Sequence, residues 1–445
     1  MLSHRGPRPT VRPVTRSTAL LTDHYELTML QAALASGAAH RRCIFELFAR
    51  RLPEGRRYGV VAGTGRALEG LAAFRFDDDA LGVLDGVVDD ATLAWLADYR
   101  FAGDVWGYGE GEVYFPDSPV LVVEGTFAEA VLLETFLLSV FNHDSAVASA
   151  ASRMTLVAEG RPCIEMGSRR THEEAAVAAA RAAYLAGFAT SSNLAARQRY
   201  GVPSAGTSAH AFTLVHDSED DAFRAQVASL GTGTTLLVDT YDVAEAVRRG
   251  IEIAGTGLGA VRLDSGDLGV LARDVRRELD ALGAHDTRIV VTSDLDEYAI
   301  AALAAAPVDG YGVGTRLVTG SGHPTCGFVY KLVAREDDDG RLVPVAKRSP
   351  QKGSVGGRKW AARRVVGGRA VAEVVSHADT FAEDERPLLR PLVRAGEIVG
   401  TEPLDVARER HAAAVRELPV AARSMARGEP VIPTEHRTAR GSVAP

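Results

Sequence analysis

From about residue 145 onward the sequence repeats one unit, in which a short apolar run is followed by a longer segment with helical patterning. The spacing between successive runs, mostly roughly 20 to 30 residues, is typical of βα units that assemble into a parallel sheet covered by helices. Either a closed βα barrel or an open doubly wound sheet satisfies this periodicity, so the pattern indicates an α/β fold and leaves both architectures open. The six runs with strand character are Cys163-Ile164-Glu165-Met166, Gly187-Phe188-Ala189-Thr190, Leu236-Leu237-Val238, Ala260-Val261-Arg262-Leu263, Arg288-Ile289-Val290-Val291 and Asp309-Gly310-Tyr311-Gly312-Val313.

The region before this repeat has a different pattern and predicts an α+β domain. Asp23 is a candidate helix N-cap, Glu26 stands three residues later, and an apolar stripe with helical spacing follows. Strands are expected over residues 43–48 and 119–123, with short helices and glycine-rich turns between them.

The region after the repeat changes character again. Residues 338–340 have the composition of a hairpin tip that leads the chain out of the barrel, and a helix is expected over residues 404–418, before Pro419. We expect this last region to pack on the N-terminal domain. The chain is therefore divided into a disordered basic arm (1–17), an N-terminal α+β domain (18–144), a catalytic α/β barrel (145–335) and a C-terminal region (336–445).

The composition excludes several classes of protein. Hydrophobic residues make up 46% of the chain and charged residues 24%, and no apolar run is long enough to span a membrane. The net charge of −8 argues against nonspecific binding to nucleic acid. The three cysteines lack the spacing of a zinc site or a disulfide framework, and the basic arm lacks the apolar segment of a secretory signal. These features predict a cytoplasmic protein.

Polar clusters follow almost every predicted strand of the repeat. In a βα barrel the carboxyl ends of the strands meet on one rim, where active sites are built, so the clusters predict one shared site. A single Asp or Ser at such a position is explained by capping of the following helix, but capping does not account for the whole set. The clusters are Ser168-Arg169-Arg170, Ser191-Ser192-Asn193, His210, Asp239, Asp264-Ser265-Gly266-Asp267, Ser293-Asp294 and Gly312-Val313-Gly314-Thr315.

Two of these clusters suit a phosphorylated sugar. Gly312-Val313-Gly314-Thr315 offers backbone N–H groups and a hydroxyl that could surround a phosphate after a late strand, although two glycines also form plain turns. The pattern matches neither the Walker nor the dinucleotide fingerprint. Arg262 and Asp264 lie on the same side of an extended strand, where they would bind phosphate and sugar oxygens or form a strand-end ion pair.

His210 lies in a run of small residues, Gly206-Thr207-Ser208-Ala209-His210-Ala211-Phe212, where a side chain can stand exposed in a cleft. A histidine in such a place serves as a base, a metal ligand, a phosphoryl acceptor or a hydrogen-bonded structural residue. No HxxxH or His/Cys grouping lies nearby, so no metal site held by the protein alone is predicted.

These motifs together resemble the nicotinate phosphoribosyltransferase family, from near Thr22 to the C-terminal region and most closely in its actinobacterial branch. The histidine run and the Asp-Ser-Gly-Asp run are the most specific of them. The matching runs are Thr22-Asp23-His24-Tyr25-Glu26-Leu27-Thr28-Met29, Phe141-Asn142-His143, Glu165-Met166-Gly167-Ser168-Arg169-Arg170, Gly206-Thr207-Ser208-Ala209-His210, Arg262-Leu263-Asp264-Ser265-Gly266-Asp267-Leu268 and Tyr311-Gly312-Val313-Gly314-Thr315.

The resemblance implies a fold, an activity and an assembly. The fold would be the irregular, TIM-like α/β barrel of the type II phosphoribosyltransferases, with an α+β domain built from both ends of the chain. The activity would be that of an ATP-dependent ligase of NAD salvage, which joins nicotinate to 5-phosphoribosyl 1-diphosphate with Mg²⁺ as cofactor. The family also implies a cytoplasmic homodimer whose active sites use both subunits.

The resemblance also gives the phosphate and ribose contacts an expected role. His210 would be phosphorylated by ATP, while Arg262 and Asp264 would hold the phosphoribosyl group. Three residues would hold its 5-phosphate, namely Gly312, Gly314 and Thr315.

The pyridine ring is expected to bind elsewhere on the same rim. Tyr25, supplied by the neighbouring subunit, and Arg169 would frame the ring and its carboxylate. The remaining residues expected to contact the substrates are Asn142, Met166, Ser192, Asp267 and Asp294.

The chain departs from its relatives at two positions and is informative at a third. Met166 stands where many relatives have a ring-stacking Phe, and Ala211 stands where many have Ser. Nicotinamide-using relatives place an Asp near the position of Ser192, where it would repel the nicotinate carboxylate. Ser192 and Arg169 therefore favour nicotinate over nicotinamide.

Three other functions remain as alternatives. A nicotinamide- or quinolinate-using phosphoribosyltransferase would share the barrel. A barrel aldolase or lyase would need a Schiff-base lysine, and no predicted barrel strand end before Lys331 carries one. An inactive binding module is disfavoured because His210, Arg262, Asp264 and Asp267 are all present.

Overall fold

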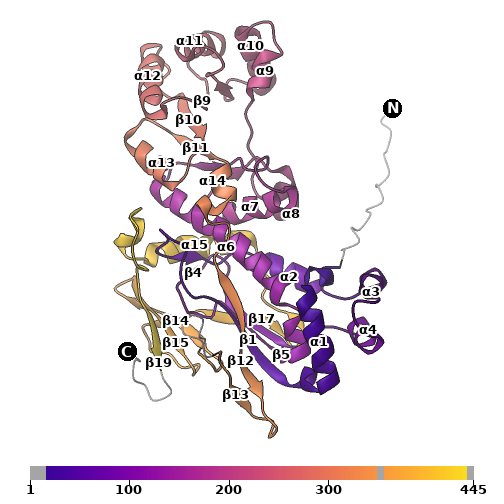
Figure 1. Ribbon diagram of the computed structural model, residues 1–445. Coiled ribbons are helices and arrows are strands. Elements are labelled where there is room, and N and C mark those ends of the chain that lie inside the picture. The colour runs from indigo at the N-terminus through magenta and orange to yellow at the C-terminus, as the bar shows by residue number, and fades with distance from the viewer. Residues whose placement is uncertain (1–16, 348–354, 438–445) are drawn as a thin grey trace, which may run out of the picture.

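The computed structural model describes residues 17–347 and 355–437 (Figure 1). The basic arm expected over residues 1–17 therefore lies, apart from Ser17, outside the described residues. Figure 1 shows two lobes, with a parallel sheet and its helices in the upper lobe and mainly antiparallel sheets in the lower lobe. The long helix α6 (Glu134–Val157) runs between the lobes and is buried along much of its length. Across the described ranges, no helix is both long and apolar enough to cross a membrane.

The upper lobe contains a curled sheet of six parallel strands in the order β7-β6-β11-β10-β9-β8. The last strand along the chain, β11, pairs with the first, β6, whereas the last strand of a doubly wound sheet lies at an edge. This cyclic order is that of a βα barrel, opened between β7 and β8, which the described residues do not pair with each other. The strands are β6 (Cys163–Glu165), β7 (Thr190–Ser191), β8 (Thr235–Leu237), β9 (Ala260–Leu263), β10 (Arg288–Ser293) and β11 (Gly310–Val313).

Helices connect these strands, and the longer ones among them bury an apolar face. Along α12, for example, Ala272, Val275 and Leu279 are buried at spacings of three and four residues, as expected for a helix that covers a sheet. The helices of the upper lobe are α7 (Glu173–Leu185), α8 (Leu194–Tyr200), α9 (His210–Leu214), α10 (Glu219–Leu230), α11 (Val243–Ala254), α12 (Leu268–Ala281), α13 (Glu297–Ala302) and α14 (Thr315–Val318).

The main sheet of the lower lobe draws its strands from both ends of the chain. Its order is β13-β12-β1-β5-β3-β17-β18, and every neighbouring pair is antiparallel. Strand β12 pairs with β1, so residues 328–335 lie in this sheet and not in the barrel, where the sequence had placed them. Strand propensity shows that a segment is extended but not which sheet it joins. The strands are β1 (Arg42–Ala49), β3 (Asp104–Tyr108), β5 (Leu121–Thr126), β12 (Phe328–Glu336), β13 (Leu342–Pro344), β17 (Leu389–Arg394) and β18 (Glu397–Ile398).

Smaller sheets, six further α-helices and short 3-10 helices make up the rest of the described residues. Helix α15 (Leu404–Glu417) ends just before Pro419, as expected, and packs against α7 of the upper lobe. The C-terminal region therefore contacts both lobes, since β17 pairs with β3 in the lower one. The other strands are β2 (Gly59–Val60), β4 (Val113–Tyr114), β14 (Trp360–Val366), β15 (Arg369–Ser376), β16 (Glu385–Pro387) and β19 (Thr434–Arg437). The other helices are α1 (His24–Ser36), α2 (Thr64–Ala72), α3 (Asp78–Leu84), α4 (Asp90–Ala97) and α5 (Phe127–Val131).

The predicted start of α1 agrees with the structure, but the predicted start of β7 does not. Asp23 caps α1 and forms a capping box with Glu26, which confirms the predicted helix start. The strand predicted over residues 187–190 begins only at Thr190. The N–H groups of Gly187 and Phe188 still bond carbonyls near the end of α7, so these residues terminate the helix.

A buried ion-pair cluster joins the two lobes. Glu297 of α13 accepts from Arg56 Nη1 at 2.9 Å and from Arg153 Nε at 3.1 Å, and all three side chains are almost wholly buried. Arg56 Nη2 also donates to the carbonyl of Gly320 at 2.8 Å. The Arg56 loop of the lower lobe is therefore anchored to α13 and to the segment that follows α14.

Candidate active site

The parallel strands bring their carboxyl ends to one edge of the upper lobe, and the predicted polar residues follow those ends. Arg169 comes after β6, Ser192 after β7, Asp239 after β8, Asp264 after β9 and Asp294 after β10. Neighbouring strands are parallel and hydrogen-bonded, so these residues form one rim.

A cavity of about 200 Å³ opens on this rim. Guanidinium groups and carboxylates share its lining with small backbone-exposing residues, a combination that suits a ligand with phosphate and hydroxyl groups. Seven of the residues predicted from the sequence line it, namely Met166, Arg169, Asp264, Asp294, Gly312, Gly314 and Thr315. The other lining residues are Arg170, Thr292 and Ser293.

The base of the cavity is too tightly packed for a side chain at Gly312. A Cβ there would lie 2.4 Å from Thr292 Cγ2 and 2.9 Å from Met166 Sδ. The Met166 thioether therefore lies directly beside the β11 backbone and lines the cavity, where a sulfur packs well on the face of an aromatic ring.

Asp264 is held in place by two neighbouring strands. Thr292 Oγ1 on β10 donates to Asp264 Oδ1, and the Asp264 N–H donates to Asp239 Oδ2 at 3.0 Å. The carboxylate of Asp264 is therefore oriented before any ligand binds, which is the arrangement that charge-assisted recognition requires.

Arg262 lies two residues before Asp264 on β9, but it is buried and does not line the cavity. Its Nη1 donates to Thr207 Oγ1 and, at 3.0 Å, to the carbonyl of Ser208. Burial lowers the pKa of Arg262, and the carboxylates of Asp264 and Asp239 oppose that shift. The predicted contact between Arg262 and the phosphoribosyl group stays a prediction.

His210 is the first residue of α9, and a buried carboxylate holds its ring. Its Nε2 lies 3.2 Å from Asp239 Oδ1, and the imidazole is 39% exposed while the Asp239 side chain is 3% exposed. Asp239 Oδ2 also accepts from Ser265 Oγ at 2.7 Å. The ring is thus held at Nε2 and is partly exposed to solvent.

A buried glutamate connects the two loops that carry the predicted ring-binding residues. Glu165, the last residue of β6, accepts from the N–H of Gly167 and from Ser191 Oγ, and its carbonyl accepts from the Ser192 N–H at 2.8 Å. Burial raises the pKa of Glu165, whereas the two hydrogen bonds to its carboxylate lower it. Glu165 thereby ties the turn before Arg169 to the loop that contains Ser192.

Two predicted or neighbouring polar residues act as helix caps. Asn193 Oδ1 accepts from the Ala196 N–H at 2.8 Å at the start of α8, and Asp267 Oδ1 accepts from the Val270 N–H at 3.1 Å at the start of α12. The alternative that polar residues after the strands cap the following helices therefore holds for the observed contacts of Asn193 and Asp267. Ser192 is exposed on the rim and lies outside the lining of the cavity.

Asn142 and Tyr25 do not line the cavity of their own chain. Asn142 Oδ1, on α6, accepts from the Phe328 N–H at 2.9 Å and from Thr325 Oγ1 at 2.8 Å. Tyr25, on α1, is 43% exposed, and partial burial together with the nearby Glu134 raises its pKa to about 12. Contacts of these two residues with a substrate stay predictions.

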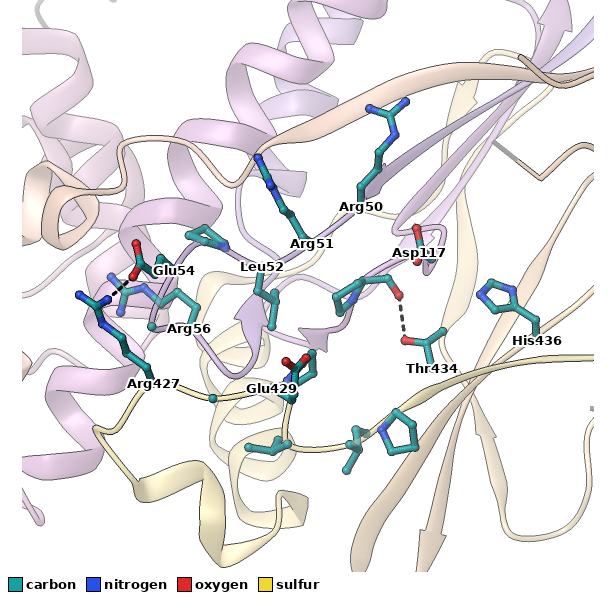
Figure 2. Close-up of a pocket in the computed structure, with 18 residues that line it drawn as sticks. Arg50, Arg51, Leu52, Glu54, Arg56, Asp117, Arg427, Glu429, Thr434 and His436 are labelled. Carbon is teal, nitrogen blue, oxygen red and sulfur yellow. Dashed lines mark hydrogen bonds and ion pairs between the residues drawn. The ribbon is translucent and has the colours of Figure 1, made fainter. Parts of the chain in front are cut away.

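A larger cavity of about 910 Å³ lies between the loop after β1 and the segment before β19 (Figure 2). Figure 2 shows that charged groups in it face one another, since Arg427 pairs with Glu54. The carbonyl of Pro116 accepts from Thr434 Oγ1 at 2.8 Å across the same cavity. None of the predicted site residues lines it, so volume alone does not identify the active site.

Reasoning from the sequence overlooked several residues that organise the rim. Asp239 was recognised as part of a polar cluster without a role, and its position directly after a strand was the available signal. Arg170 was given no role although it stands beside Arg169. Glu165 carries no local signal, because it lies inside a predicted strand, whereas Thr292 directly follows the predicted strand over residues 288–291 and that position was its signal.

Comparisons with known proteins agree with this geometry. Residues 20–142 match the family model of the nicotinate phosphoribosyltransferase N-terminal domain. The chain is 58% identical to a nicotinate phosphoribosyltransferase of Mycobacterium tuberculosis over 96% of its own length and 99% of that protein. It is 38% identical to the nicotinate phosphoribosyltransferase of Bacillus subtilis, over 77% of this chain and 72% of that protein.

The fold also matches a solved structure. The crystal structure of human nicotinic acid phosphoribosyltransferase superposes with a TM-score of 0.80 at 26% identity, covering 95% of this chain and 98% of that one. The expected architecture, a type II phosphoribosyltransferase barrel with a mixed domain, is thereby confirmed. With a sequence and a fold shared over nearly their whole length with these proteins, the chain belongs to the nicotinate phosphoribosyltransferase family.

Proposed function

We propose that this chain joins nicotinate to 5-phosphoribosyl 1-diphosphate to form nicotinate mononucleotide and diphosphate, the first step of NAD salvage from nicotinate. In the same catalytic cycle ATP transfers its γ-phosphoryl group to His210 and leaves as ADP, and hydrolysis of the phosphohistidine then releases phosphate. The observation that carries the proposal is the rim itself. Asp264 lines a cavity with guanidiniums and carboxylates, and its N–H donates to Asp239, the buried carboxylate that holds the partly exposed imidazole of His210. The enzyme is expected to work in the cytoplasm, in line with its three free cysteines.

The ribosyl transfer needs positioning and charge more than it needs a base. Positive charge builds on the sugar as diphosphate leaves, so the oriented carboxylate of Asp264 stabilises that charge. The pyridine nitrogen is itself the nucleophile, and a ring placed by Arg169 and Met166 attacks the anomeric carbon directly. Arg170 lines the same cavity and adds a second positive charge for the anionic substrates.

The phosphoryl transfer uses the ring nitrogen of His210 that Asp239 leaves free. When Asp239 Oδ1 accepts from Nε2–H, the lone pair lies on Nδ1, which becomes the nucleophile toward the γ-phosphate of ATP. The same carboxylate stabilises the imidazole as it gains positive charge. Asp239 is therefore a positioning residue of the proposed phosphoenzyme step.

Mg²⁺ fits this site as a partner of the diphosphate. Within the described ranges no three His, Cys, Asp or Glu side chains form a cage for a metal ion, and Mg²⁺ commonly uses one or two carboxylates together with phosphate oxygens. Asp264 and Asp294 both line the cavity and would hold it in that way. The ion supplies neutralisation of the leaving diphosphate.

A homodimer with shared active sites would bring Tyr25 to the ring. Tyr25 does not line the cavity of its own chain, yet it stays exposed together with other apolar side chains around the start of α1. An exposed apolar surface of this kind is typical of a protein interface. These exposed residues are Leu20, Leu21, Tyr25 and Met29.

One assay tests the proposed function directly. Purified enzyme is given phosphoribosyl pyrophosphate with nicotinate, nicotinamide or quinolinate, with and without ATP, and mononucleotide formation is followed. We expect product with nicotinate alone among the three pyridines, and a higher rate when ATP is present. Preference for nicotinamide or quinolinate would support the rival phosphoribosyltransferases, and no product with any pyridine would support a binding module.

Replacing Ser192 by Asp is expected to raise the KM for nicotinate about tenfold or more, because it places a negative charge near the substrate carboxylate. The KM for phosphoribosyl pyrophosphate should change much less. Steady-state kinetics measure both constants, and Ser192→Ala serves as the control without the charge. Unchanged nicotinate kinetics in Ser192→Asp would show that this loop does not face the ring.

Replacing Asp264 by Asn is expected to weaken the binding of phosphoribosyl pyrophosphate by about 1–3 kcal/mol, because charge-assisted hydrogen bonds are lost while their partners stay in place. Isothermal titration calorimetry measures the change. Asp274→Asn, on the exposed side of α12, is the matched control and should bind as the wild type does. An affinity of Asp264→Asn equal to that of the control would remove Asp264 from the ribose site.

A further inference from the structure

The segment that precedes His210 is held by hydrogen bonds more than by packing. Residues 205–209 form no helix or strand, and a Cβ added at Gly206 would meet no atom within 4 Å. Arg262 crosses from β9 to this segment, donating from Nη1 to Thr207 Oγ1 and, at 3.0 Å, to the carbonyl of Ser208. The position of His210 therefore depends on contacts made at residues 207 and 208.

The Arg262 contact and the Asp239 contact restrain the same histidine from two strands. Asp239, after β8, holds the imidazole at Nε2. Arg262, on β9, holds the Thr207 hydroxyl and the Ser208 carbonyl, three and two residues before the histidine. The backbone carbonyl of Ser208 exists in any variant, so the Thr207 hydroxyl is the part of this anchor that a side chain supplies. A buried charged donor makes such a hydrogen bond stronger than one between neutral groups.

We infer that Thr207 is a positioning residue for the phosphorylation of His210, acting through its hydrogen bond to Arg262. The inference rests on the proposed phosphohistidine step. It adds the hydrogen bond that positions the His210 ring for attack on the γ-phosphate. A nucleophile displaced by about 1 Å loses much of its rate, because near-attack geometry is lost. Thr207 touches neither the γ-phosphate nor the ribose in this role, since it works by fixing the backbone that carries the histidine.

The same contact links the two half-reactions. Arg262 is on β9, two residues before Asp264 in the same extended run, and is only 8% exposed as a residue. Its Nε nevertheless has no hydrogen-bond partner among the described residues. A phosphoribosyl ligand that accepts a hydrogen bond from this guanidinium would alter the hydrogen bond that Arg262 donates to Thr207. By thermodynamic reciprocity, occupancy of the ribose site and the position of His210 would then influence each other.

The test compares Thr207→Val, which removes the hydroxyl at nearly constant volume, with Thr207→Ser, which keeps it. Full-length wild type and both variants are given γ-labelled ATP without phosphoribosyl pyrophosphate, and the rate of alkali-stable labelling is measured. We expect Thr207→Val to label about tenfold more slowly, because a hydrogen bond from a charged donor is lost, and Thr207→Ser to label near the wild-type rate. All three proteins should unfold in one cooperative thermal transition, with Thr207→Val lowered by no more than about a few degrees, because Arg262 keeps its bond to the Ser208 carbonyl.

Leaving out phosphoribosyl pyrophosphate keeps any change at the ribose site from affecting the result. If Thr207→Val labels as fast as the wild type, the Thr207 inference is overturned and the phosphohistidine proposal stands. If Thr207→Ser is as slow as Thr207→Val, the hydroxyl is not the group that matters and the inference is likewise overturned. If the wild type itself takes up no label, the proposed phosphoenzyme fails, and this outcome differs from both of the others.

Discussion

Replacing His210 by alanine is expected to abolish ATP-dependent labelling of the protein and ATP stimulation of product formation, while a slow ATP-independent transfer remains. The two half-reactions need different groups. Ribosyl transfer relies on positioning and charge at Asp264 and the cavity, whereas only the phosphoenzyme step requires an imidazole nucleophile. Because phosphohistidine is stable in alkali and labile in acid, the wild-type label should survive base and be lost in acid.

His285→Ala is the matched control for this experiment. His285 is an exposed histidine of the same lobe, in the loop between α12 and β10 and away from the rim. It should label and turn over as the wild type does. If His210→Ala also labels normally, another residue accepts the phosphoryl group. If it loses every activity together with thermal stability, His210 is a structural residue.

Replacing Glu297 by Gln is expected to lower the free energy of unfolding by about 3–5 kcal/mol, because it leaves two buried arginines without their counter-charge. Glu297 is 3% exposed and accepts from both Arg56 and Arg153. Removing one member of a buried pair costs far more than the pair itself contributes, since the remaining charges cannot be rehydrated. Urea denaturation followed by circular dichroism measures the change.

The pH dependence of this cluster has a definite sign. Burial of Glu297 raises its pKa, but Arg56, Ser321 and Arg153 outweigh burial and hold the pKa below its ordinary value. A carboxylate with a depressed folded-state pKa contributes stability above its unfolded pKa and loses it as pH falls through the folded pKa. The gap in stability between wild type and Glu297→Gln should therefore narrow on acidification.

An exposed glutamate provides the control for the Glu297 variant. Glu245 forms surface ion pairs with Arg248 and Arg249 on α11, where solvent screens the charges. Glu245→Gln should unfold at a urea midpoint close to that of the wild type. If Glu297→Gln unfolds at the same midpoint as Glu245→Gln, the buried cluster does not hold the lobes together.

The site residues that could be predicted from the sequence are those whose signal lies in the few residues around them. Met166, Arg169, Asp264, Asp294, Gly312, Gly314 and Thr315 follow or end predicted strands, and all line the cavity. Parallel strands force their carboxyl ends to one edge, so a chain position after a strand is also a spatial position. The same reasoning did not separate Asp267, which caps α12, from the residues that line the cavity.

The α/β class and most strand positions of the barrel could be predicted from the chain alone, because they follow from periodicity and capping within a few residues. One strand pairing and two long-range side-chain contacts could not be predicted, because no local sequence pattern indicates them. Pairing placed β12 beside β1 instead of in the barrel. Packing turned Arg262 toward Thr207, 55 residues away, and joined Arg56 to Glu297 across 241 residues. Such contacts form because polar and charged groups that become buried need hydrogen-bond or ion-pair partners. Which groups are buried together is set only when the chain folds and the lobes pack.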